Sequence, residues 1–226
     1  MSSNEEDEGA LRAEVLSAKA AMQNATGRYT QITGKNPEFL LGANARATVV
    51  GNAKLAGAKL LSAREDILND MPREGHVAEV GTQTGRFAKL ILNRLPKIHL
   101  HTIDIDYSLF DHEGLQPFVD DGRLTIVEAL SWDGLAQYEP DFFEWIYVDA
   151  SHFYDHVKAD LELAKTRVRV GGTIICNDYT IWSPFEVEPY GVMQAVNEFL
   201  KDEDFVVTHF AFHPFGYHDI ALKRCS

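Results

Sequence analysis

The sequence contains little cysteine, with only Cys176 and Cys225 among its 226 residues. Two cysteines so far apart form neither a metal-binding spacing nor the disulfide framework of a small secreted protein. The sequence also lacks an apolar run of about 18–20 residues, the length that a membrane-spanning helix needs. Residues 1–30 show no basic segment followed by an apolar one, the pattern of a signal peptide. We therefore expect two free thiols and a cytoplasmic protein.

Positive charge is scarce, because 34 acidic residues outnumber 21 basic ones and leave a formal net charge of −13. Such a surface repels phosphate backbones and anionic lipid headgroups, so we expect neither a nucleic-acid partner nor a membrane partner. The apolar content of 45% is enough for a sizeable core. The length favours one domain with an extension.

The first third of the chain is poor in strand patterns. Residues 1–9 are polar and acidic, which predicts a disordered start. Residues 10–74 form a predicted helical extension, with apolar helical spacing first between Leu11 and Met22 and again over 52–71, before Pro72. The glycine-interrupted stretch between them, residues 24–51, predicts irregular structure. It leaves open a lid over a site or a subunit contact in a homo-oligomer.

Residues 75–226 alternate between strand-like and helix-like segments, which predicts an α/β domain with a mostly parallel sheet covered on both faces. The predicted strands cover 76–80, 98–104, 123–127, 144–150, 170–178, 205–211 and 217–223. The predicted helices cover about 85–95, 108–119, 132–138, 154–167 and 190–200. Only about five residues separate the last two strands, too few for a parallel crossover, so these strands should form an antiparallel hairpin. Seven strands closed in this way make a narrow architectural class.

A glycine turn, AEVGTQTGRFAKLIL, follows the first strand of this domain. Gly81 permits a tight turn, and Gly85 permits a close approach of backbone where the helix begins. Asp104, at the end of the second strand, lies 25 positions after Glu79, where a carboxylate can accept hydrogen bonds from ribose hydroxyls. In an open parallel sheet, ligands bind beyond the carboxyl ends of the strands.

The order E-V-G-T-x-T-G, then I-D-I-D, then the closing hairpin resembles class I S-adenosylmethionine-dependent methyltransferases. The resemblance covers residues 75–226 and implies a Rossmann-like fold and S-adenosylmethionine as cofactor. The implied cofactor-binding residues are Glu79, Gly81, Thr82, Gly85, Asp104, Ser131, Trp132 and Asp149. A dinucleotide-binding enzyme would more often carry G-x-G-x-x-G, which this turn does not match.

Oxygen-bearing side chains also end the fourth and fifth strands, with Asp149 on one and Asn177 and Asp178 on the other. Because these strands are neighbours in that fold, the three side chains could bind Mg²⁺, which prefers carboxylate and carbonyl oxygens. Such an ion would activate a substrate hydroxyl for attack on the methyl group. His152, three residues after Asp149, is the candidate general base, since its ordinary pKa lies near neutrality.

The run D-A-S-H, followed by a helix and R-V-G-G-T-I-I-C-N-D-Y, resembles the metal-dependent, macrocin-type sugar O-methyltransferases. This resemblance implies metal ligation by Asp149, Asn177 and Asp178 and catalysis by His152 with Asp149. The chain departs from relatives that carry two consecutive acids after the fifth strand, because Asn177 comes first. The implied activity is methyl transfer to a hydroxyl of a small molecule, such as a sugar or a catechol-like diol.

Other interpretations remain open at this stage. Asp149 could serve only the cofactor, His152 could begin a helix, and Asp178 could end a strand without a further role. The enzyme would then be a metal-independent methyltransferase. A nicotinamide-dependent oxidoreductase would share the sheet and the acidic ribose contact, and a non-catalytic binding protein would share the cofactor site. The aromatic residues of 180–191 fit either an acceptor wall or the core.

Overall fold

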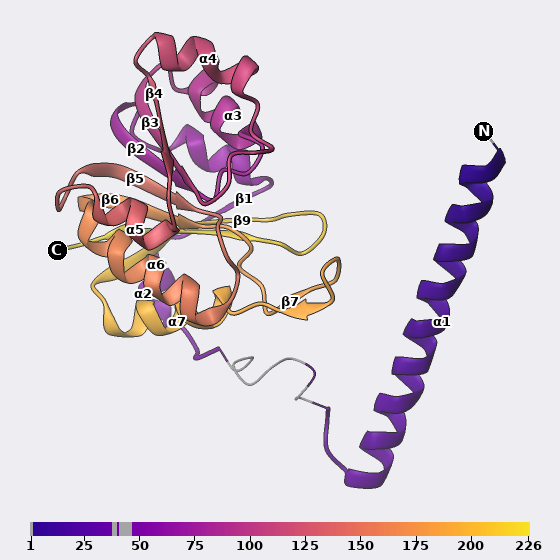
Figure 1. Ribbon diagram of the computed structural model, residues 1–226. Helices are drawn as coiled ribbons and strands as arrows, with labels where there is room; N and C mark the ends of the chain where they lie inside the picture. The colour runs from indigo at the N-terminus through magenta and orange to yellow at the C-terminus, as the bar shows by residue number, and fades with distance from the viewer. Residues whose placement is uncertain (1, 38–39, 41–46) are drawn as a thin grey trace. The chain divides into compact units, whose positions relative to one another are not determined.

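The computed structural model describes residues 2–37, 40 and 47–226, which divide into two compact units, Met1–Gly42 and Ala43–Ser226. The first unit is built on α1 (Ser2–Thr33), a single long helix (Figure 1). This helix replaces both the disorder predicted for residues 2–9 and the irregular structure predicted for 24–33. Alanine, glutamate and lysine are strong helix formers, and acids near the N-terminus favour the helix dipole. Residues 38–39 and 41–46 of the predicted irregular segment lie outside the described part.

The second unit holds an eight-stranded sheet with the strand order β1-β9-β10-β6-β5-β2-β3-β4. Its strands are β1 (Lys59–Leu61), β2 (Glu74–Val80), β3 (Lys97–Asp104), β4 (Leu124–Glu128), β5 (Phe143–Val148), β6 (Val168–Cys176), β9 (Phe205–Ala211) and β10 (Asp219–Arg224). All neighbouring pairs are parallel except those of β10, which is antiparallel to both β6 and β9. The predicted fold class is therefore confirmed, with a mostly parallel sheet and an antiparallel C-terminal hairpin.

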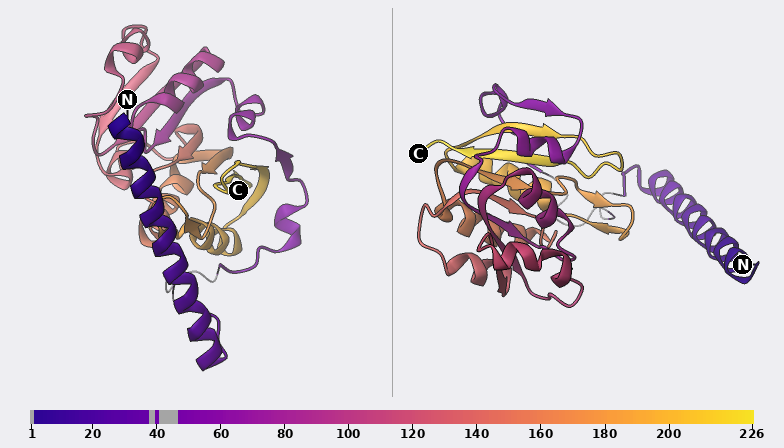
Figure 2. Two further views of the ribbon diagram at one scale, coloured as in Figure 1. Left: turned by 90° about the vertical axis from the view of Figure 1, so that its right-hand side faces the viewer. Right: turned by 90° about the horizontal axis from the view of Figure 1, so that it is seen from above.

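Helices cover both faces of the sheet (Figures 1 and 2). They are α3 (Arg86–Arg94), α4 (His112–Asp120), α5 (Ser131–Ala136), α6 (Tyr154–Arg167) and α7 (Val192–Asp202). Consecutive strand residues point to opposite faces, so Val77 and Trp145 pack with α3 and α4, whereas Ala78 and Ile146 pack with α5, α6 and α7. Burial on both faces explains the continuous apolar runs of the central strands.

The prediction of one helix over residues 52–71 is wrong. That stretch forms α2 (Asn52–Leu55), the strand β1 and a 3-10 helix, η2 (Arg64–Asn69), and β1 adds an eighth strand parallel to β9. Leu61, Ile67 and Leu68 all pack into the cluster beneath α3, but they reach it from two short elements. Their helical spacing therefore arises because they pack into the same cluster, although they do not belong to one helix.

The strand register brings the ends of four neighbouring strands to one edge. Val80 pairs with both Ile103 and Val148, and Val148 pairs with Cys176. The residues that follow these positions therefore emerge together at the carboxyl edge of the sheet. Both cysteines are free thiols, as predicted. Among the described residues, no helix combines the length and the apolar character that crossing a membrane requires.

Candidate functional site

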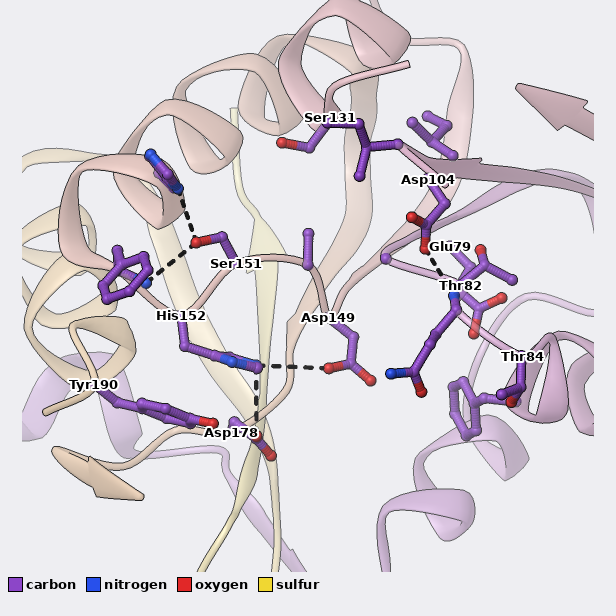
Figure 3. A pocket seen from close by; sticks show the side chains of 18 of the residues that line it. Glu79, Thr82, Thr84, Asp104, Ser131, Asp149, Ser151, His152, Asp178 and Tyr190 are labelled. Atoms are coloured by element: carbon purple, nitrogen blue, oxygen red, sulfur yellow. Dashed lines mark hydrogen bonds and ion pairs between the residues drawn. The ribbon is translucent and has the colours of Figure 1, made fainter. Parts of the chain in front are cut away.

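A cavity of about 1030 Å³ opens at the carboxyl edge of β2, β3, β5 and β6 (Figure 3). It brings together nine of the residues singled out from the sequence: Glu79, Gly81, Thr82, Asp104, Ser131, Trp132, Asp149, His152 and Asp178. Gly85 and Asn177 are not part of its lining. The cavity thus unites the ends of the strands predicted to bind the cofactor with those predicted to carry the chemistry.

Gly81 is required by the geometry of the first turn. Its φ of +87° lies in the left-handed region, and a Cβ atom there would overlap the backbone of Asp149. Its N–H donates to the Ile103 carbonyl at 2.8 Å, which ties the turn to β3. Gly85 has a different function, because a Cβ atom there would strike the side chains of Leu115 and Phe110. Gly85 therefore permits α3 and α4 to pack and does not face the cavity.

Glu79 and Thr82 supply buried polar atoms that need a partner. Glu79 is 1% exposed and Thr82 is 5% exposed. Within the described residues, Glu79 Oε2 and Thr82 Oγ1 have no hydrogen-bond partner. Burial, followed by the nearby charge of Asp149, raises the pKa of Glu79 well above its ordinary value. Since an unpaired buried carboxyl group is costly, these atoms fit a ligand that brings a cationic donor, such as the ammonium group of the cofactor's methionine part.

Asp104 fixes the shape of the turn as well as lining the cavity. Its Oδ2 accepts a hydrogen bond from the backbone N–H of Gln83 at 2.7 Å (Figure 3). Its Oδ1 accepts one from the backbone N–H of Asp106 at 3.1 Å. Carboxylate oxygens accept more than one hydrogen bond each, so Asp104 keeps capacity for ribose hydroxyls. Ser131 and Trp132, at the start of α5, line the same side of the cavity.

His152 lies between two carboxylates (Figure 3). Its Nε2 is 3.4 Å from Asp178 Oδ2 and 3.7 Å from Asp149 Oδ1. Both distances exceed those of good hydrogen bonds, and this buried nitrogen has no hydrogen-bond partner in the described part of the chain. The ring of Tyr190 stacks on the imidazole, with centroids 4.4 Å apart and an angle of 14° between the planes. The arrangement holds the ring and leaves Nε2 able to accept a proton.

The pKa values of His152, Asp149 and Asp178 depend on burial and on one another's charges. Burial lowers the pKa of His152, but the contact with Asp149 and the charge of Asp178 outweigh burial and raise it above the ordinary value. Burial, and then the charge of Asp149, raises the pKa of Asp178 to about 6. Burial also raises the pKa of Asp149, against the opposing influence of His152 and Arg64. Perturbed titratable groups in a cavity mark a candidate catalytic centre.

The structure does not bring the three predicted magnesium ligands together. Asn177 is 5% exposed, and its amide donates to Asp219 Oδ1 at 2.9 Å, behind the cavity wall. Asp219 also accepts a hydrogen bond from the Tyr147 hydroxyl at 2.7 Å. Among the described residues, no group of three or more His, Cys, Asp or Glu side chains is placed to hold a metal ion. The predicted ligand set therefore does not fit Mg²⁺ in this arrangement.

The sequence did not point to two charged residues, one that lines the cavity and one that lies beside Ser131 of its lining. Arg64, from η2, reaches the cavity, where Nη1 lies 3.7 Å from Asp149 Oδ2 and the guanidinium carbon lies 4.9 Å from the centre of the Phe87 ring. Asp160, on α6, is fully buried without a hydrogen-bond partner in the described residues, and burial raises its pKa to about 6. Neither belongs to a motif. Arg64 lies on η2, an element separate from the strand ends that form the site. Asp160 occupies a position of α6 where nothing in the sequence distinguishes it from an ordinary polar helix residue.

The loop between β6 and α7 contributes to the cavity wall. It contains a small hairpin, β7 (Trp182–Ser183) and β8 (Glu188–Pro189). Phe185 and Tyr190 from this loop line the cavity together with Tyr217, from the loop before β10. The rings of Phe185 and Tyr217 are nearly parallel at 5.9 Å. Trp182 is not part of the lining, so the loop's aromatic residues divide between the wall and other packing.

The comparisons with known proteins agree with this geometry. Residues 78–179 match the sequence model of a family described as a methyltransferase domain. No curated protein matches the chain. Among solved structures, the chain is similar to an O-methyltransferase family protein from Burkholderia thailandensis, with a TM-score of 0.54 and 14% identity. That match covers 72% of this chain and only 55% of the Burkholderia chain.

Two further solved structures share the fold. The pyocyanin biosynthetic protein PhzM matches with a TM-score of 0.56 and 14% identity, over 92% of this chain and 67% of its own. A geranyl diphosphate methyltransferase in complex with S-adenosylmethionine matches with a TM-score of 0.56 and 12% identity, over 71% of this chain and 82% of its own. Together, these comparisons show that residues 78–179 match a methyltransferase-domain model and that the chain shares its fold with methyltransferases of known structure.

Proposed function

We propose that the protein transfers a methyl group from S-adenosylmethionine to a hydroxyl of a small organic molecule, with His152 as the general base. The observation that carries the proposal is the position of the His152 imidazole. It lies in the same cavity as Glu79, Gly81 and Asp104, with a buried Nε2 that has no hydrogen-bond partner within the described residues. A hydroxyl is the acceptor group that needs such a base, because it must lose a proton as it is methylated.

The cofactor would be held by the first two strand ends. Glu79 and Thr82 offer buried oxygens for its ammonium group, and Asp104 offers a carboxylate for its ribose hydroxyls. Ser131 and Trp132 would flank the adenine, while Gly81 lets the turn approach closely. Asp149 lies at the boundary between the two halves of the cavity. It would interact both with the cofactor and with His152. When bound, S-adenosylmethionine supplies an electrophilic methyl group on sulfur.

The other half of the cavity would bind the acceptor. Phe185, Tyr190 and Tyr217 present rings to it, while Asp178 and Glu186 add carboxylates. Rings favour an organic acceptor with an apolar face, and carboxylates repel an anionic one. We propose a neutral sugar or a catechol-like diol, whose second hydroxyl can donate to Asp178 while the first gives its proton to His152 Nε2. The finer likeness to macrocin-type sugar O-methyltransferases rests on the D-A-S-H run, the helix after it and the segment R-V-G-G-T-I-I-C-N-D-Y.

A magnesium-assisted form of the reaction is the second candidate, favoured by the fact that the carboxylates of Asp149 and Asp178 both lie near the same atom, His152 Nε2. It would require Asn177 to leave Asp219 and turn toward the cavity. Turnover in the presence of EDTA separates the two forms. Undiminished turnover supports the metal-independent reaction, whereas loss that Mg²⁺ restores supports the assisted one.

The test of the proposed function is cofactor consumption with a panel of neutral polyols, glycosides and catechols. The His152→Ala variant should lose about 10²–10⁴ of the turnover, the usual contribution of a general base. Its affinity for S-adenosylhomocysteine should stay close to that of the wild type, because His152 lies on the acceptor side. His156→Ala is the matched control, since this exposed histidine also lines the cavity but bonds to Ser151. Equal turnover in wild type and His152→Ala would remove the base from the mechanism.

A further inference from the structure

The helix α1 carries a stripe of apolar side chains, several of which are largely exposed. From Asp7 to Thr33, none of its described side chains is buried, and Leu11, Val15 and Met22 are 63%, 68% and 49% exposed. Helices in water gain most of their stability from packing an apolar face. A helix of 32 residues with such a face therefore indicates a partner surface.

The stripe follows a heptad repeat. Its apolar positions alternate between steps of four and three residues: Leu11, Val15, Ala18, Met22, Ala25, Tyr29 and Ile32. This spacing averages 3.5 residues, which is the period of a left-handed coiled coil. The first and last of these positions lie about 32 Å apart at the rise of an α-helix. In heptad notation, Val15, Met22 and Tyr29 occupy a positions, and Leu11, Ala18, Ala25 and Ile32 occupy d positions.

The charges beside the stripe identify the occupant as a second copy of the same helix. Asp7 and Glu14 occupy g positions, and Arg12 and Lys19 occupy e positions. In a parallel two-stranded coiled coil, each g residue faces the e residue five positions later on the partner. Asp7 would then face Arg12 of the partner subunit, and Glu14 would face Lys19 of the partner subunit. Both pairs join opposite charges, and symmetry doubles each of them.

The direction of the helices follows from the same positions. An antiparallel dimer of equal overlap would place Arg12 and Lys19 opposite the e-position threonines, Thr33 and Thr26, without a charge partner. A β-branched residue at a with leucine at d, as in Val15 and Leu11, also favours two parallel strands. We propose that α1 forms a parallel, in-register coiled-coil homodimer that joins two copies of this chain. The proposal is independent of the proposed enzymatic function.

Sedimentation equilibrium of the full chain tests the proposal. The wild type should show a reversible monomer–dimer equilibrium. Val15→Lys should raise the dimer dissociation constant on the order of 100-fold, because a charge replaces a buried side chain in both subunits. The matched control is Leu16→Lys, one residue away at the exposed b position, which should leave the constant unchanged within about twofold. A monomeric wild type, or equal effects of the two variants, would overturn the proposal.

Two further variants test direction and register. Glu14→Lys should raise the dimer dissociation constant about fivefold, because each new lysine would face Lys19 of the partner subunit. Adding Lys19→Glu should restore the wild-type constant, because opposite charges then face each other again. In a Cys225→Ser background, Ala18→Cys should form an intermolecular disulfide on oxidation, since d positions meet across a parallel dimer. Failure of the second substitution to rescue the first, together with no crosslink, would reject the parallel arrangement.

Discussion

At the scale of single residues, the protonation of His152 controls the proposed reaction. The carboxylates of Asp149 and Asp178 raise the pKa of His152, so the free enzyme holds its proton to a higher pH than an isolated histidine does. A general base acts only when deprotonated. Turnover should therefore rise with pH through an apparent pKa above the ordinary value of about 6.5.

Asp178→Asn tests this assignment, because it removes one of the two charges that stabilise the imidazolium. The acid limb of the pH profile should then move to lower pH, and the variant should reach its plateau at a lower pH than the wild type. Turnover measured from pH 5 to pH 9 gives the limb directly. A limb that stays in place, or that moves to higher pH, would show that Asp178 does not influence the catalytic base.

Asp160 is the residue with the clearest cost to stability. Its carboxyl keeps a proton up to about pH 6 in the native state, whereas the unfolded chain releases it near 3.8. A group with a raised native pKa loses stability as pH rises through that window. Asp160→Asn should therefore unfold like the wild type below pH 4 but be more stable, by about 3 kcal/mol, above pH 6.

Urea unfolding of both proteins at a series of pH values measures this difference. The control is Asp155→Asn, a substitution of the same kind at an exposed position of α6. A stability difference for Asp160→Asn that does not change with pH would contradict the raised pKa. Asp160 also lies beside Ser131, so the variant reports on the part of the cavity wall that is proposed to flank the adenine.

At the scale of elements, the turn between β2 and α3 holds the site together. Gly81→Ala combines a left-handed φ with overlap of the Asp149 backbone. We expect loss of S-adenosylhomocysteine binding and strong destabilisation, because β2 and β5 must move apart. Gly122→Ala is the matched control, since Gly122 has a φ of +68° and open space around it. It should cost only about 1–2 kcal/mol and keep binding.

Calorimetric titration and thermal unfolding measure both glycine variants. Equal losses of stability and of S-adenosylhomocysteine binding in the two variants would mean that the strain of a left-handed φ alone explains both losses. The close approach of Gly81 to Asp149 would then not be required. Normal binding by Gly81→Ala would reject the placement of the cofactor at this turn.

The elements that the sequence predicted well are those whose local pattern and tertiary packing agree. The helix over 154–167 and the strand over 205–211 have the predicted bounds, because periodicity and burial give the same answer there. The prediction for residues 52–71 was wrong because two short elements, β1 and η2, place apolar side chains in one cluster. The start of α1 was predicted wrongly for another reason, because no apolar pattern extends over its acidic first residues.

The candidate site could be predicted only where strand ends define it. Topology alone places the ends of β2, β3, β5 and β6 at one edge, so Asp104, Asp149 and Asp178 could be expected together. The direction of a side chain could not be derived in this way. Asn177 precedes Asp178 by one residue and points to Asp219, on a strand 42 residues later. Arg64 likewise reaches Asp149 across 85 positions of the sequence, without any motif to mark it.

At the scale of the whole molecule, the second unit places the proposed cofactor site and acceptor site on either side of Asp149. The halves come from different parts of the chain, since Glu79 and Asp104 lie on one side of Asp149 and Asp178 and Tyr190 lie on the other (Figure 3). Reaction between two bound molecules depends on this arrangement, because each half must orient its own ligand toward the other.

The central claim is that this cavity moves a methyl group onto an oxygen atom. The most direct measurement is carbon NMR of the products formed from S-adenosylmethionine labelled with ¹³C in its methyl group, using the neutral diol panel. We expect a labelled methoxy carbon with the wild-type protein, and a signal reduced by about 10²–10⁴ with His152→Ala. A label that reaches nitrogen or carbon instead, or that stays entirely on the cofactor with every hydroxylated acceptor, would contradict it.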